Sequence, residues 1–402
     1  MSVTAGIVAE YNPFHNGHLH QLECIRQHCG DSAVVIAAMS GDFVQRGEPA
    51  VMSKHARAEA ACRNGVNLVV ELPLPWCMMS AEGFANAGVF ILNSLGVSRL
   101  YFGAETPSCE LLESAAELLI QQDTVNLIKE YLVSHPEQSF ASARSAVLSE
   151  LLASDVSFLE QPNNILALEY MKAVKRNGYL MECVPLERVG SDHDSASGTG
   201  NIRSASLIRS FLSSGEYAEF LPSDPLDVVS RELSRGHCPV TADSLESALL
   251  SRLRMLPPEA FLKLPDASGG AGERLYRAVR NSSSLKSLYE NATTRRLPLS
   301  RIRRMTWFAA LGIDDSFSCS APPYARILAA DDKGREYLNA NRKRFLFPVL
   351  TKPADCSSLP YPAEEVFRIG AKARDFWSLG CSDESFRLPD NDWRSGPYMH
   401  KT

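Results

Sequence analysis

The stretch from Ala5 to Leu19, AGIVAEYNPFHNGHL, decides how the first half of this chain folds. It opens with a short apolar run, which is typical of a buried strand, and Asn12-Pro13 then breaks that run. Helical spacing of apolar residues follows from Gly17 to Cys29, and Gly30 is a stop signal. The stretch therefore predicts a strand, a turn and a helix.

The same alternation of short apolar runs and helical patterns continues along the chain. Further strands are expected at 33–39, 67–72, 100–103 and 180–189, and helical segments at 54–63, 81–95, 108–176 and 204–212. Strands that alternate with helices form βαβ units, whose parallel sheet is covered by helices on both faces. The predicted fold of this half is therefore an α/β, Rossmann-like parallel sheet.

The second half of the chain shows a different pattern. Pro222 and Pro225 mark a boundary near residue 220. Beyond it, helical patterns occur at 244–255, 272–288 and 299–311, without a convincing alternation of strands and helices. We therefore expect two domains, an α/β domain over residues 1–220 and a mainly α-helical domain over residues 221–402.

Composition excludes several classes of protein. The chain has 402 residues, 45% hydrophobic and 22% charged, which are values of ordinary globular domains and not of a collagen, a coiled coil or a disordered chain. A net charge of −6 excludes a uniformly basic nucleic-acid coat. The ten cysteines show neither a C-x-x-C motif nor zinc-ligand spacing, so no metal site is predicted. Without a signal-peptide pattern or an apolar run of membrane length, we expect a soluble cytoplasmic protein.

The turn after the first strand carries His15, Gly17 and His18, which suit phosphate chemistry. Ligands of open parallel sheets bind beyond the carboxyl ends of the strands, where a helix N-terminus offers free N–H groups to phosphate. Gly17 lets the backbone approach the ligand, and the two histidines can stabilise charge on an α-phosphate and a leaving pyrophosphate. This arrangement suits adenylylation by ATP. Two alternatives stay open, namely histidines that cap or pack the helix, and a zinc site that includes His20.

The tetrapeptide His15-Asn16-Gly17-His18 resembles the HxGH signature of the nucleotidyltransferase superfamily. The longer string GIVAEYNPFHNGHLHQL is similar to one family within it, the tRNA(Met) cytidine acetate ligases. The resemblance extends over roughly residues 3–340, through the strings MSGDFVQRGEPA (39–50), ARAEAA (56–61), GVNLVVELP (65–73), SAEGFANAGV (80–89), FGAE (102–105), QPNNILALEYM (161–171), ASGTGNIRSASLIR (196–209), TTRRLPLSRIRRM (293–305) and YARILAADDKGREYL (324–338).

This resemblance implies a specific reaction. An ATP-dependent ligase of this kind activates acetate as acetyl-adenylate, and then transfers the acetyl group to N4 of the wobble cytidine of elongator tRNA(Met). The products are N4-acetylcytidine, AMP and pyrophosphate. The resemblance implies a nucleotidyltransferase-like ATP-binding domain over 1–220, a tRNA-binding domain over 221–402, and no membrane or protein partner. It leaves open whether Mg²⁺ accompanies ATP.

The resemblance also implies which residues contact ATP, with His15 and His18 as the catalytic pair. The implied contacts are Ile7, Val8, Ala9, Glu10, Tyr11, Asn12, Pro13, Phe14, His15, Asn16, Gly17, His18, Leu19, His20, Gly103, Asn163 and Arg188. The neighbouring Asn164 competes with Asn163, because one of the pair is an obvious helix N-cap. Gly103 is either a platform under the nucleoside or an ordinary turn glycine.

A second motif, Ser204 to Arg209, resembles the other signature of the superfamily. Hydroxyl and N–H groups at this helix start, with Ser206 among them, would hold the β- and γ-phosphates, and Arg209 would add positive charge. The alternative is an N-capped surface helix without a ligand.

Asp42 and Arg46 follow the second strand, so both are expected at the carboxyl edge of the sheet. Arg46 could bind acetate or the phosphates, or form a weak surface ion pair with Glu48. A carboxylate at Asp42 would repel phosphate unless Arg46 or a metal neutralises it.

The segment from Glu273 to Arg344 is strongly basic, with 15 Lys or Arg against 7 Asp or Glu. Such a one-sided distribution is expected of phosphate-backbone binding, although a solvated helix face would also show it. The arginines expected to bind tRNA are Arg295, Arg296, Arg301, Arg303 and Arg304. Two rival functions remain, a transferase or ligase with a different small substrate, and a non-catalytic RNA-binding module with a relic nucleotide site.

Overall fold

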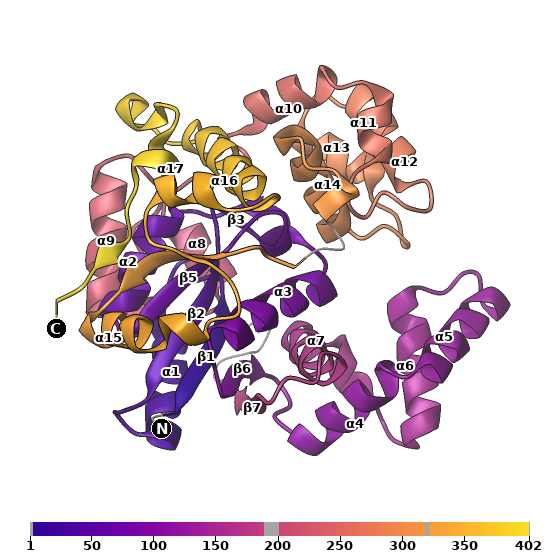
Figure 1. Cartoon of the computed structure of the whole chain (residues 1–402). Coiled ribbons are helices and arrows are strands. Elements are labelled where there is room, and N and C mark those ends of the chain that lie inside the picture. Colours follow the sequence, from indigo (N-terminus) through magenta and orange to yellow (C-terminus); the bar gives the residue numbers. More distant parts are fainter. Residues whose placement is uncertain (1–2, 189–200, 318–320, 402) are drawn as a thin grey trace.

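A single sheet organises the computed structural model, which describes residues 3–188, 201–317 and 321–401 (Figure 1). The strand order is β10-β8-β5-β2-β1-β6-β7, and β9 pairs with β8. The strands β1, β2, β5, β6 and β7 run parallel, whereas β8 is antiparallel to β5. The bounds are β1 Thr4–Ala9, β2 Val34–Ser40, β5 Leu68–Leu72, β6 Arg99–Ala104, β7 Glu182–Glu187, β8 Ala325–Ala330, β9 Val349–Leu350 and β10 Tyr398–Met399.

Helices cover both faces of this sheet, because its central strands are apolar on both sides. Every residue of β2 and β5 is buried. Alternate residues of β2 enter different cores: Val34, Ile36 and Ala38 face one, while Val35, Ala37 and Met39 face the other. The predicted Rossmann-like α/β fold is confirmed.

The chain up to residue 234, which includes α9 just beyond the predicted boundary at 220, supplies nine α-helices in the described residues. They are α1 Asn16–Cys29, α2 Lys54–Arg63, α3 Ala81–Ser94, α4 Cys109–Leu119, α5 Gln122–Ser134, α6 Phe140–Leu152, α7 Pro162–Arg176, α8 Ala205–Phe211 and α9 Ser223–Ser234. A small hairpin, β3 Phe43–Val44 and β4 Glu48–Pro49, follows β2. Figure 1 shows α4, α5 and α6 away from the sheet, with α5 and α6 at the far end.

The second half is mostly helical but also completes the sheet. Its helices are α10 Glu246–Arg254, α11 Pro258–Leu262, α12 Ala271–Arg280, α13 Leu285–Ala292, α14 Leu299–Leu311, α15 Asp332–Asn341, α16 Ala363–Ser378 and α17 Asn391–Arg394. The strands β8, β9 and β10 were not apparent from the sequence: β9 and β10 have two residues each, and the short apolar run of β8 is equally compatible with a buried helix. The boundary at residue 220 stays a prediction, although strands from beyond it join the sheet.

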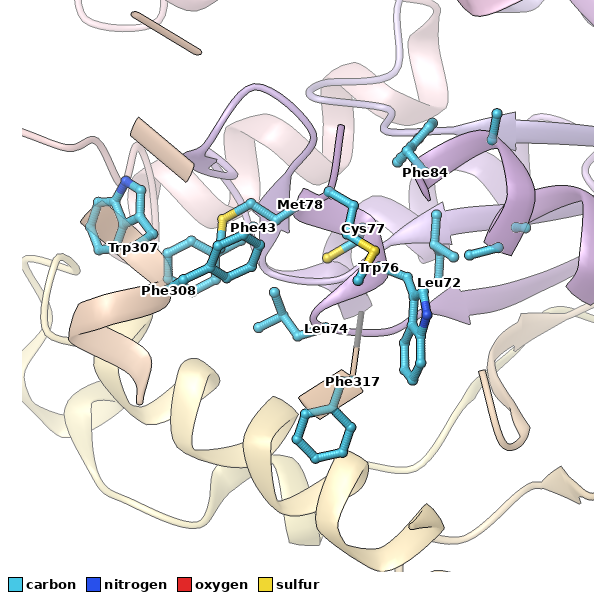
Figure 2. Packing of buried hydrophobic residues seen from close by; sticks show 14 of the residues in the cluster. Phe43, Leu72, Leu74, Trp76, Cys77, Met78, Phe84, Trp307, Phe308 and Phe317 are labelled. Atoms are coloured by element: carbon cyan, nitrogen blue, oxygen red, sulfur yellow. The ribbon is translucent and has the colours of Figure 1, made fainter. Parts of the chain in front are cut away.

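The helices α10 to α14 form a lobe beside the sheet, which we call the helical lobe (residues 246–311) (Figure 1). Trp307 and Phe308 of α14 pack near Phe43 of the β3–β4 hairpin (Figure 2), and the ring centroids of Phe43 and Trp307 are 5.1 Å apart. These residues belong to the same buried core as Leu72 and Trp76, which lie at and beyond the end of β5. The lobe is therefore anchored at the carboxyl edge of the sheet.

None of the helices in the described ranges combines the length and the apolar character that a membrane span requires.

Candidate functional site

The turn between β1 and α1 fixes two histidines by backbone hydrogen bonds. His15 is the N-cap of α1, and its Nδ1 accepts a hydrogen bond from the N–H of Gly17 at 3.1 Å. The Nδ1 of His18 accepts from the N–H of His15 at 3.2 Å. Because both Nδ1 atoms are acceptors, each neutral ring carries its proton on Nε2. The alternative in which the histidines cap the helix is therefore realised, and it leaves each Nε2–H available as a donor.

The surroundings keep both imidazoles uncharged. The two rings stack with centroids 3.8 Å apart, and the ring of Tyr11 meets His18 edge-on at 4.9 Å. Burial, with the positive charges of Arg188 and Arg209, lowers the pKa of His15 to about 3. Burial, His15 and Arg188 likewise hold the pKa of His18 well below its ordinary value. The pair therefore acts at neutral pH as hydrogen-bond donors without charge.

Three arginines bring positive charge to this turn from separate elements. Arg209 of α8 donates to the carbonyl of Asn12 and to the hydroxyl of Ser206, each at 3.1 Å. Arg188 follows β7 directly, and its positive charge helps to lower the pKa of His15, as that of Arg209 does. Arg46 is exposed, and its positive charge helps to lower the pKa of Arg188. The fold thus assembles cations around neutral donors at a helix N-terminus, which is an arrangement that suits a polyphosphate.

The structure separates the two candidate asparagines. Asn163 accepts a hydrogen bond from Arg188 at 3.1 Å, so it lies at the site. Asn164 is fully buried, where it accepts from the N–H of Thr106 and donates to the carbonyl of Phe158. Its role is to hold the loop after β6.

Gly103 has a local reason to be glycine. A Cβ at this position would lie 3.0 Å from Cγ of Arg188, so a larger residue would push that arginine away from the turn. Gly103 also pairs in register with Leu186 of β7, the strand that ends at Arg188. Gly103 therefore positions Arg188. This role is independent of the predicted contact between Gly103 and the nucleoside.

Other residues of the first motif stabilise the conformation of the turn. Asn16 donates to the carbonyls of Asn201 and Glu219, and so ties the turn to the segments flanking α8. His20 points along α1 towards Cys24, with 3.7 Å between ring nitrogen and sulfur. The strand residues Ile7, Val8 and Ala9, the turn residues Pro13 and Phe14, and Leu19 of α1 are buried or half-buried. Of the motif strings, residues 196–200 lie outside the described residues.

Glu10 lies at the end of β1, and its Oε1 accepts from the N–H of Gln45 at 2.9 Å. Burial raises the pKa of Glu10, although this hydrogen bond and the charges of Arg209, Arg46 and Arg57 oppose the shift. The bond joins the β3–β4 hairpin to the first turn.

Sequence analysis missed the contribution of Arg57. This fully buried side chain of α2 donates to four backbone carbonyls, those of Glu10, Ser40, Gly41 and Met52. It joins the carboxyl ends of β1 and β2, where those carbonyls would otherwise lack partners. Burial lowers the pKa of Arg57 to about 10, so the guanidinium stays charged. The only signal in the sequence was a charged residue within the alanine-rich string ARAEAA.

The cations that neutralise Asp42 are Arg374 and Lys54, and not Arg46. Asp42 is buried, and its Oδ1 accepts from the N–H of Lys54 at 2.8 Å and from Arg374 at 3.2 Å. Burial pushes the pKa of Asp42 upward, but Arg374 and Lys54 outweigh it and leave that pKa lowered. The alternative prediction for Arg46, a surface ion pair with Glu48, is wrong, because Glu48 forms its ion pair with Arg303.

A buried ion network surrounds Asp42 beneath the carboxyl edge. Lys54 lies 2.8 Å from both Glu71 and Asp392, and Arg326 lies 2.7 Å from Asp392. With Asp42 and Arg374, the network balances three carboxylates against three cations. Residues beyond 345 therefore contribute Arg374 and Asp392 to this network.

The predicted tRNA-binding arginines fall into two groups. Arg295 and Arg296 are exposed. Arg301 donates to the carbonyls of Asp266 and Ser268, Arg303 pairs with Glu48, and Arg304 is buried against Asp266. The last three are therefore engaged within the protein.

The described residues contain no group of three His, Cys, Asp or Glu side chains arranged to hold a metal ion. The zinc alternative for His15, His18 and His20 thus gains no support from the geometry, since His20 points away from the turn.

Comparison with known proteins agrees with this geometry. The model of the HIGH nucleotidyl transferase family matches residues 1–390. The tRNA(Met) cytidine acetate ligase of Kosmotoga olearia is 32% identical, with 97% of each chain covered. The enzyme of the same name from Thermotoga maritima is 32% identical, with 98% of this chain and 99% of its own covered. The crystal structure of Thermotoga maritima TmcAL bound with alpha-thio ATP superposes with a TM-score of 0.91 at 30% identity, covering all of both chains.

Proposed function

Because the chain belongs to the tRNA(Met) cytidine acetate ligases within the HIGH nucleotidyl transferase family, we propose that it uses ATP and acetate to acetylate a tRNA cytidine. The observation that carries this proposal is the stacked pair His15 and His18, neutral and with both Nε2–H groups available, in the field of Arg188 and, for His15, of Arg209 as well. The relative bound with alpha-thio ATP supports ATP as the nucleotide.

In the first step, an acetate oxygen attacks the α-phosphorus of ATP. A bond forms between acetate and the α-phosphate, the bond to the β-phosphate breaks, and pyrophosphate leaves. His15 and His18 donate to oxygens on which negative charge develops, and they do so without losing a proton. Arg209 and Ser206 hold the departing phosphates. Arg46, exposed at the same edge, is our candidate for binding the acetate carboxylate.

The remaining predicted contacts form one side of the nucleotide site. Gly103 positions Arg188, and Arg188 donates to Asn163. We propose that these residues bind the adenosine side of ATP, since Arg209 and Ser206 are assigned to the departing phosphates. The residues Glu10 to His18 supply the turn itself.

In the second step, N4 of a cytidine attacks the acetyl carbonyl of acetyl-adenylate. The new N–C bond forms, the C–O bond to AMP breaks, and the amine loses one proton. Proximity and orientation supply much of the rate, because AMP is a good leaving group. We expect elongator tRNA(Met) as the substrate and the cytoplasm, where tRNA is found, as the place of action. Arg295 and Arg296 of the helical lobe are exposed for contact with phosphate.

Mg²⁺ would fit this site as a companion of ATP. Mg²⁺ keeps several waters and is commonly bound through substrate phosphates and one or two carboxylates rather than by a protein cage. The described residues provide no three-ligand metal cluster, so we propose that the phosphates themselves carry the ion.

Mass spectrometry of nucleosides tests the proposal. An elongator tRNA(Met) transcript is incubated with ATP, acetate and either wild-type protein or the His18→Ala variant. We expect N4-acetylcytidine with wild type and little or none with the variant. Acetate-dependent exchange of pyrophosphate into ATP, measured in parallel, follows the first step alone. Exchange with another carboxylate but not with acetate would instead favour a ligase with a different small substrate.

A further inference from the structure

A cleft lies between parts of the β3–β4 hairpin and of the helical lobe. It has a volume of about 630 Å³, which is within the range of small-molecule sites. Gly47 and Glu48 of the hairpin line one side, and Leu285, Tyr289 and Arg303 of α13 and α14 line the other. Figure 1 shows β3 close to this lobe.

The two walls of the cleft are held in place. Gly47 has a φ of +73°, and a Cβ there would lie 2.5 Å from the backbone nitrogen of Arg304, so hairpin and α14 are in direct contact. The ion pair between Glu48 and Arg303 also joins the two walls. The cleft is thus a feature of the fold, and it does not depend on one side-chain rotamer.

Two hydroxyl groups in the cleft lack partners. The hydroxyl oxygens of Tyr289 and Thr293 are shielded from solvent, and neither makes a hydrogen bond within the described part of the chain. An unsatisfied buried polar group is destabilising, and native proteins rarely retain one without a reason. Burial raises the pKa of Tyr289, so its hydroxyl keeps its proton at neutral pH. These groups are available to a polar ligand.

The other lining groups select the kind of ligand. The guanidinium of Arg303 lies 5.6 Å from the ring centroid of Tyr289, and both planar groups can stack on a nucleobase. Glu48 and Asp243 are carboxylates, which accept hydrogen bonds from an exocyclic amine such as that of cytosine. Leu285 and Leu299 add apolar surface. Stacking surfaces, amine acceptors and free hydroxyls together match an unpaired base.

The position of the cleft relative to the ATP turn decides which base this is. The hairpin touches the turn through Gln45, which donates to Glu10, and lines the cleft through Gly47 and Glu48. A base in the cleft would therefore have the hairpin between itself and the adenylate. Because the hairpin intervenes, the base in the cleft is a different one from the base that reacts.

We propose that this cleft binds a second unpaired base of the RNA, an amine-bearing base next to the cytidine that is acetylated. The proposal rests on the proposed function, because it requires an RNA substrate. Exposed arginines of the same lobe, Arg295 and Arg296, are available to hold the flanking phosphates.

Two variants test the cleft, each measured on the full chain. Tyr289→Ala removes the stacking surface, and Leu299→Trp fills the cleft from a residue that is 38% exposed. Each should raise the KM for tRNA about tenfold to a hundredfold, as expected for loss of one stacked base, and leave acetate-dependent pyrophosphate exchange unchanged. The matched control is Leu262→Trp, a residue of the same lobe that is 50% exposed and does not line the cleft. It should behave as wild type.

Substitution of bases in the RNA completes the test. When the loop base next to the reacting cytidine is replaced by uridine, which has no exocyclic amine, the KM of wild type should rise while that of Tyr289→Ala should change little. The cleft proposal is overturned if Tyr289→Ala and Leu299→Trp match Leu262→Trp on a tRNA that wild type acetylates. Failure of the proposed function looks different: wild type itself then yields no N4-acetylcytidine, and both proposals fall.

Discussion

The guanidinium of Arg374 lies 3.2 Å from the carboxylate of Asp42, although 332 residues separate the two along the chain. Both side chains are buried. Arg374 also lies over the ring of Trp377 at 4.3 Å, which orients the guanidinium. Because Arg374 neutralises its charge, the carboxylate of Asp42 does not repel phosphate at the nearby site.

Replacement of Arg374 by Met should strongly destabilise the protein. Asp42 would remain buried without its ion-pair partner, and removal of one partner of a buried pair typically costs about 3–5 kcal/mol. Urea unfolding measures the loss. The double variant Asp42→Asn with Arg374→Met should regain part of it, because no unpaired charge is then left. Equal stability of the single and double variants would contradict this explanation.

The exposed Arg368 provides the control on the same helix. It pairs with Glu364 at 2.6 Å, and both side chains are accessible to water. Because exposed ion pairs contribute little, Arg368→Met should leave the free energy of unfolding close to that of wild type.

The lowered pKa of His15 should make stability depend on pH. Between about pH 3, its folded pKa, and pH 6.5, its unfolded value, the unfolded chain binds the proton more tightly than the folded one. The stabilising effect of a neutral His15 is thus fully present above pH 6.5 and is lost as the pH falls below it. From pH 7 to pH 5, wild type should lose about 2 kcal/mol more than His15→Asn, whose amide oxygen can still cap α1. Parallel pH curves of the two proteins in urea unfolding would argue against a neutral His15.

Adenylate formation should depend on the Nε2–H donors. His15→Ala and His18→Ala should each slow acetate-dependent pyrophosphate exchange by about 10²–10³, the usual effect of removing one donor to developing charge. His28→Ala, at the exposed end of α1, should leave exchange unchanged. Circular dichroism confirms that the inactive variants are folded. A His18→Ala variant that exchanges at the wild-type rate would refute the assigned role.

Arg295 and Arg296 should bind phosphate, whereas Arg304 should stabilise the lobe. The double variant Arg295→Ala with Arg296→Ala should weaken tRNA binding and reduce the slope of log K against log salt by about one per arginine. Arg304→Ala should instead lower resistance to urea, because Arg304 is buried against Asp266 at 2.7 Å. Filter binding at several salt concentrations distinguishes these outcomes. An unchanged salt slope in the double variant would place the RNA elsewhere.

Much of the candidate site was predictable because its parts are close in sequence. His15, Gly17 and His18 lie within one helical turn, so their spacing alone sets their geometry once a strand precedes them. The helix start at Ser204 was recognisable for the same reason, since its hydroxyl caps α8 by accepting from Leu207. Burial of the whole of β2 likewise follows from its local apolar run.

The strands of the second half could not be predicted in this way. Ala325–Ala330 is a short apolar segment, and a short apolar run is equally compatible with a buried helix. It becomes β8 because β5 offers it an antiparallel edge, and that edge exists only after the first half has folded.

By itself the sequence determined the strand, turn and helix that present His15 and His18, because hydrogen bonds between near neighbours define that geometry. Only the tertiary structure decided which charges meet. Arg57 binds the ends of two strands, Arg374 neutralises Asp42, and Arg303 leaves the expected basic surface to pair with Glu48. Burial makes such pairings obligatory, since an unpaired charge is costly in the interior, but the choice of partner depends on how distant segments pack and not on their spacing in sequence.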